Sequence, residues 1–164
     1  MEALRSSFKA IRSLKSLFDT SSNNELIQRI EKLTRNSLPL WGKMTVNQMI
    51  EHADLHLKMT TGEIKVSRSF TGKIFGLLVK KIILNKDNAL SKSLPTHEKL
   101  IPVGNPDLDL LKKNLINSVS KFSRIGANNI GKDSQHYFFG KLSDKDWDIL
   151  MWKHLDHHLK QFGV

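Results

Sequence analysis

The chain is 164 residues long and carries 26 lysine and arginine residues against 16 acidic ones, a formal net charge of +10 at pH 7. This length suits one domain with a hydrophobic core of its own. The sequence contains no cysteine, which excludes a disulfide, a thiolate metal ligand and a catalytic thiol. A bound metal would therefore need nitrogen or oxygen ligands. The positive charge favours an anionic partner without identifying one.

Residues 1–16 are basic and repeat their apolar positions with a helical period, as at Leu4, Phe8 and Ile11. We predict a basic N-terminal helical extension over 1–16 and one domain over 17–164. The extension is interpreted as a docking or frayed helix, with a membrane-surface or targeting segment as the alternative. No apolar run is long enough to span a bilayer. A sequence without cysteine or signal-peptide features is expected in the cytoplasm.

Periodic apolar residues predict four main helices, and no stretch alternates long enough to predict a sheet, so the fold class is all-α. The first helix is expected to begin at Ser22, where Glu25 completes a capping pair, and to run to about Arg35. The second begins at Thr45, with Gln48 as its capping partner.

An additional helix is predicted over 70–84, in the connection between the second and third helices. Its residues are apolar on every side, so we expect it to pack across the bundle or at an interface, such as that of a homodimer. The third helix is predicted to begin at Asn105 and Pro106, and the fourth at Ser143, with Asp146 as its capping partner, ending near Phe162. The expected architecture is an up-down-up-down four-helix bundle with an extra N-terminal helix.

Two histidines of the last helix, His154 and His158, are four residues apart and fall on its apolar side, whereas His157 falls at the edge of that side. This spacing places two imidazoles one turn apart, where both can bind one cation. The alternative is a pair of core histidines that are hydrogen-bonded to their neighbours. His52 and His56 of the second helix repeat the spacing, which favours the metal-ligand interpretation.

The stretches "LWGKMTVNQMIEHADLHL" and "HYFFGKLSDKDWDILMWKHLDHHLKQFG" resemble the DinB-like (YfiT-like) metalloenzyme superfamily, within it a branch of uncharacterised bacterial domains. The similarity runs from about Leu17 to Val164. Members are four-helix bundles that bind a divalent ion, often zinc or nickel, through one histidine of the second helix and a pair on the last. The resemblance implies His52, His154 and His158 as metal ligands.

The resemblance also implies supporting residues around the ion. His56 has no counterpart among the superfamily ligands, so it is expected to support the ligands or contact substrate; a role as fourth ligand stays open. Gln161 matches a glutamine that follows the histidine pair in many members, which suggests a similar supporting role. His136 is a third candidate, at the mouth of the site. Tyr137 stands where the branch usually has proline, which changes the loop after His136.

Three histidine ligands would leave a coordination position open for water or substrate. The first hypothesis is therefore a divalent-metal-dependent enzyme, a thiol-dependent transferase or a hydrolase, acting on a small molecule with a low-molecular-weight thiol among the candidates. Zinc or nickel is expected, with iron or manganese as alternatives. The second hypothesis is a non-catalytic basic bundle that binds nucleic acid or an anionic surface. Nucleic acid is disfavoured because the cationic residues are scattered and no recognition motif is present. A third is a bundle that keeps the metal site without turnover.

Overall fold

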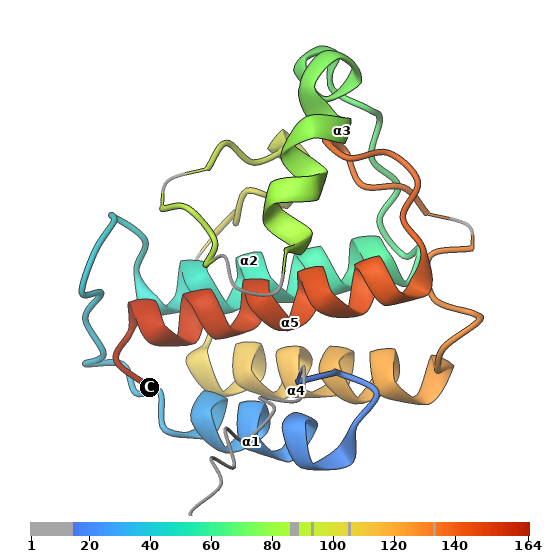
Figure 1. The fold of residues 1–164 in the computed structure, drawn as a ribbon. Helices are drawn as coiled ribbons and strands as arrows, with labels where there is room; N and C mark the ends of the chain where they lie inside the picture. The colour runs from blue at the N-terminus through green and yellow to red at the C-terminus, as the bar shows by residue number, and fades with distance from the viewer. Residues whose placement is uncertain (1–14, 86–88, 93, 105, 133) are drawn as a thin grey trace, which may run out of the picture.

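The computed structural model describes residues 15–164 except 86–88, 93, 105 and 133 (Figure 1). The predicted extension lies outside these residues, apart from its last two positions. The described chain forms five α-helices, α1 (Thr20–Glu31), α2 (Val46–Thr60), α3 (Phe70–Leu84), α4 (Leu108–Ile125) and α5 (Asp144–Gln161), and one short 3-10 helix, η1 (Glu98–Leu100). Over this part of the chain there is no β-strand, only an isolated bridge between His136 and Gly140. The predicted all-α bundle is confirmed.

Two helices begin where the capping pairs predicted. Thr45 caps α2 and Ser143 caps α5, each in a reciprocal capping box with the residue three positions later. α1 begins earlier than predicted because the carboxylate of Asp19 caps it and accepts a hydrogen bond from the backbone N–H of Ser22 at 2.9 Å. α4 likewise begins after a capping aspartate, Asp107. The bounds of α3 agree with the prediction.

α1, α2, α4 and α5 form the bundle, with α2 packed between α4 and α5, and α1 against the same two helices (Figure 1). The amide of Asn47, at the start of α2, donates to the carbonyl of Pro106, just before α4. Further along both helices, Asp54 accepts from Ser118. Residue numbers therefore rise together along α2 and α4, and the two helices are parallel.

Because α2 and α4 are parallel, the predicted up-down-up-down order is wrong. The four bundle helices run up-down-down-up. α1 and α4 are antiparallel, since Phe18 stacks on Phe122 while Lys112 donates to the carbonyl of Glu31. The connection over 61–107 is long enough to return along the bundle before α4 begins, so it removes the need for neighbouring helices to alternate.

The core lies between these four helices and contains fully buried large side chains from each of them, including Leu26, Ile50, Phe122 and Trp147. α3 differs, because it lies above the α2–α5 layer (Figure 1). Its buried residues are Gly72, Gly76 and Ile83, and Val79 and Leu84 pack against the core at partial burial. Most of its apolar side chains are exposed. α3 thus packs across the bundle, one of its two predicted placements, but the expectation that its apolar sides would be covered is wrong for the described chain, which leaves them open to an interface. No helix of the described chain is both long and apolar enough to cross a membrane.

Candidate metal centre

Four imidazoles meet between α2 and α5: His52 and His56 from α2, His154 and His158 from α5. His52 lies 4.5 Å from His56, 5.1 Å from His154 and 5.0 Å from His158, measured between ring centroids. His154 lies 4.2 Å from His56 and 4.6 Å from His158. Because α2 and α5 are antiparallel, both pairs spaced i, i+4 face each other. His52 and His154 thus belong to two triads, one completed by His158 and the other by His56.

Two of the four rings are oriented by hydrogen bonds at Nδ1. The Nδ1 of His52 lies 3.0 Å from the carbonyl oxygen of Leu100 in η1, and that of His158 lies 2.9 Å from the side-chain oxygen of Gln161. Both partners are acceptors, so each Nδ1 carries the proton and each Nε2 keeps a free lone pair. Metal-binding histidines are commonly held in this way by an outer partner.

The other two rings have unsatisfied nitrogens. Among the described residues, the buried Nδ1 atoms of His56 and His154 have no hydrogen-bond partner. Each unsatisfied buried polar atom costs about 1 to 3 kcal/mol. One ligand nitrogen from each of His52, His56 and His154 falls within 4.8 Å of the others, close enough to share a cation. The residues present therefore fit a bound divalent metal ion.

The electrostatics of the cluster keep all four imidazoles neutral. Burial lowers the pKa of His52, and burial together with the neighbouring histidines lowers the pKa of His56 and His154 well below the usual value of 6.5. The same causes, burial first, lower the pKa of His158 to about 3. The neutral ring is the form with a lone pair for a metal, so the cluster can bind a cation at neutral pH without first losing protons.

Residues from two loops cover one side of the cluster. The hydroxyl of Thr96 lies 3.5 Å from the Nε2 of His56, and the Tyr137 ring lies 6.3 Å from the His56 ring. The Tyr137 hydroxyl donates to the carbonyl of Pro95 at 3.0 Å, which ties the two loops together. His97 packs edge-on against Tyr137. Thr96 and His97 were missed in the sequence because they lie in a long loop without periodicity.

The supporting residues implied by the resemblance lie around the cluster. Gln161 is buried and spans two elements, because its Nε2 also donates to the carbonyl of Trp41 at 2.8 Å. Gly42, in the left-handed region at φ +81°, allows this approach, since a Cβ there would lie 2.7 Å from that Nε2. His157 is half-buried and packs against Trp41 and His158.

His136 is buried beside the cluster, close enough to lower the pKa of His56. Its Nδ1 accepts hydrogen bonds from the backbone N–H groups of Phe138 and Phe139, and its ring stacks on Phe139. These contacts fix the turn that carries Tyr137.

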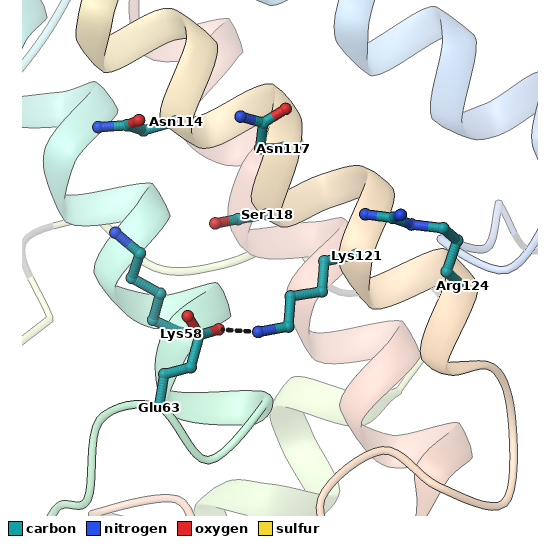
Figure 2. Close-up of a pocket in the computed structure, with 7 residues that line it drawn as sticks. All are labelled: Lys58, Glu63, Asn114, Asn117, Ser118, Lys121 and Arg124. Carbon is teal, nitrogen blue, oxygen red and sulfur yellow. Dashed lines mark ion pairs between the residues drawn. The ribbon is translucent and has the colours of Figure 1, made fainter.

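A shallow cavity of about 200 Å³ lies on the opposite side of α2, between α2 and α4 (Figure 2). Both of its lysines pair with acids: Lys58 with Asp54 at 2.7 Å, and Lys121 with Glu63 at 3.0 Å, the pair marked in Figure 2. These pairs neutralise most of its positive charge, so the cavity is a weaker site for an anion than its lysines suggest. Its lining residues are Lys58, Glu63, Asn114, Asn117, Ser118, Lys121 and Arg124.

Fold and site together define an all-helical bundle with a buried cluster of histidines that could hold a metal ion. The family model described as "Protein of unknown function (DUF1569)" matches residues 12–163, so the chain belongs to this family. No curated protein and no solved structure matches the chain.

Proposed function

We propose that the chain is a metal-dependent enzyme with one divalent ion in the histidine cluster, related to the DinB-like superfamily. The observation that carries this proposal is the meeting of four neutral imidazoles from α2 and α5, among which the buried Nδ1 of His154 has no hydrogen-bond partner in the described chain. A cluster of purely structural histidines would be expected to satisfy its buried nitrogens, because each one left unpaired costs stability. A metal ion, zinc or nickel for preference, would remove part of that cost.

We propose His52, His154 and His158 as the ligands. His52 and His154 belong to both triads of the cluster. His158 is chosen as the third because Gln161 holds its Nδ1 proton and so fixes which nitrogen is free. His56 belongs to the triad with the closest ligand atoms, but its Nε2 faces Thr96 of the covering loop. This position favours contact with a substrate that enters beside Thr96 and Tyr137.

A bound divalent ion in such a site would lower the pKa of a water molecule or stabilise a thiolate. The chain's own residues supply the surroundings. The protonated Nδ1 groups of His52 and His158 keep the rings in place, and Tyr137 and Thr96 narrow the approach to His56. Because the chain has no cysteine, a reacting thiol has to come from a small-molecule substrate. We therefore propose a thiol-dependent transferase or a hydrolase, located in the cytoplasm.

The ligand set can be tested by measuring metal affinity in single alanine variants. His154→Ala and His158→Ala should lose the ion, whereas His56→Ala should keep it. His157→Ala is the matched control, since His157 lies on the same helix and packs against His158 without being a proposed ligand, so affinity should change far less than in His158→Ala. Loss of the ion in His56→Ala with retention in His158→Ala would assign the other triad instead.

The proposal that the chain is an enzyme is tested by a turnover assay on the metal-loaded chain. Transfer reactions with low-molecular-weight thiols and hydrolysis of small esters and amides cover the two proposed classes. We expect turnover in one class, and its loss in His56→Ala with the ion still bound. A chain that binds the ion and turns over neither class would support a bundle that keeps the site without catalysis.

A further inference from the structure

Helix α3 presents an apolar surface to solvent, which we call the α3 face. It consists of six large side chains, each more than half exposed: Phe70, Ile74, Phe75, Leu77, Leu78 and Ile82. Large contiguous apolar surfaces are uncommon on proteins that have no partner for them. This surface is therefore expected to have an occupant.

The α3 face is fixed in its outward direction by tight packing on the opposite side of the helix. A Cβ on Gly72 would lie 2.5 Å from the backbone oxygen of Phe138, and a Cβ on Gly76 would lie 2.3 Å from the same atom. Such distances leave room only for glycine. At the far end of the helix, the Lys153 ammonium of α5 donates to the carbonyl of Ile83 at 2.8 Å. Rotating α3 to bury its apolar side would break these contacts.

All the charged side chains of α3 are positive. The helix contains Lys73, Lys80 and Lys81 and no acidic residue. Lys80 pairs with Asp146 of α5 at 2.7 Å, whereas Lys73 and Lys81 belong to the exposed residues of the helix. Lys81 follows Leu77 by one turn and Ile74 by two, which places it within the α3 face.

A second copy of the chain fits this pattern poorly. Packing two α3 faces together would bring the Lys81 ammonium groups into an apolar interface, and α3 offers no carboxylate to pair with them. Desolvating an unpaired charge is costly. A membrane surface has no such conflict, because a lysine can bury its aliphatic stem and direct its ammonium toward lipid phosphates.

We propose that the α3 face docks the protein on the surface of an anionic phospholipid membrane. Its apolar side chains would enter the boundary between headgroups and acyl chains while Lys73 and Lys81 contact the phosphates, as in amphipathic helices that lie in a membrane plane. The proposal is independent of the metal site, because none of the four clustered histidines belongs to α3.

The test is sedimentation of the full chain with vesicles of phosphatidylcholine mixed with phosphatidylglycerol, beside vesicles of phosphatidylcholine alone. We expect stronger binding to the anionic vesicles, weakened by added salt. The double variant Leu77→Gln, Leu78→Gln should bind at least about tenfold more weakly. Lys81→Gln should bind the anionic vesicles about fivefold more weakly.

Matched controls lie on α4, where Leu110 and Lys113 are also exposed. Leu110→Gln and Lys113→Gln should change vesicle binding less than about twofold. An unchanged metal content and thermal unfolding midpoint would show that the double variant is folded.

Three results would overturn the proposal. The first is equal binding to both kinds of vesicle. The second is anionic binding that the double variant does not weaken, which would place the contact on another part of the chain. The third is absence of vesicle binding together with a concentration-dependent dimer that the double variant disrupts, which would make a second copy the occupant of the α3 face.

Discussion

Replacing Gln161 by methionine should separate the support of the cluster from the cluster itself. Methionine has a similar size and a flexible chain, so it can fill the same buried space without hydrogen-bonding groups. The substitution removes the acceptor for the Nδ1 proton of His158 and the donor to the carbonyl of Trp41. Both groups would be left without these partners inside the protein.

Leaving the buried Nδ1 proton of His158 unpaired costs about 1 to 3 kcal/mol, and the Trp41 carbonyl, which is only partly buried, adds less, so the metal-free variant should lose at least about 1 kcal/mol of its free energy of unfolding. Removing the outer partner of a ligating histidine also weakens metal binding by roughly 10- to 100-fold. Urea unfolding of the metal-free chain measures the first effect, and competition with a chelator measures the second. Lys160→Met, on the exposed side of the same turn, is the control and should change stability by less than about 0.5 kcal/mol.

Urea unfolding of Gln161→Met tests the two hydrogen bonds, and chelator competition tests the role of His158 as a ligand. Unchanged unfolding would refute the argument that these two hydrogen bonds stabilise the end of α5. Reduced stability with unchanged metal affinity would contradict the assignment of His158 as a ligand that Gln161 orients.

Three further predictions concern stability. Burial lowers the pKa of His136 to about 3, so below about pH 6.5 the unfolded state binds more protons. The free energy of unfolding of the metal-free chain, measured with urea, should thus fall by at least about 2 kcal/mol between about pH 7.5 and about pH 5. A free energy of unfolding that does not change over this pH range would contradict this prediction. Gly76→Ala places a Cβ against the backbone oxygen of Phe138 and should cost about 1 to 3 kcal/mol; an unchanged thermal midpoint would show that α3 can shift freely. Ser118→Ala removes a donor from the buried carboxylate of Asp54 and should cost about 1 to 3 kcal/mol in chemical denaturation, and a neutral effect would mean that the ion pair with Lys58 suffices.

The sequence was most informative where a local interaction decides the structure. The pairs Thr45–Gln48 and Ser143–Asp146 each satisfy backbone groups within one helical turn, and both helices begin there. The facing of His154 and His158 also follows from the helical period alone. Predicting these features requires no knowledge of the rest of the fold.

Features that depend on distant parts of the chain could not be predicted in this way. The direction of α4 is set by a connection of more than forty residues, whose path no local pattern fixes. The backbone carbonyl of Leu100 carries no sequence signal, although it orients His52. The exposure of α3 follows from the close approach of Gly72 and Gly76 to the loop at Phe138, whereas composition alone favoured burial of this helix.

Elemental analysis of the purified chain would show whether the histidine cluster holds a metal ion. The chain should be purified without a histidine tag or chelator, beside His154→Ala and the control His157→Ala. We expect near one divalent ion per chain in the wild type and in the control, and almost none in His154→Ala. A wild-type chain that holds no metal and takes up none from added zinc, nickel or manganese would show that the histidines are structural.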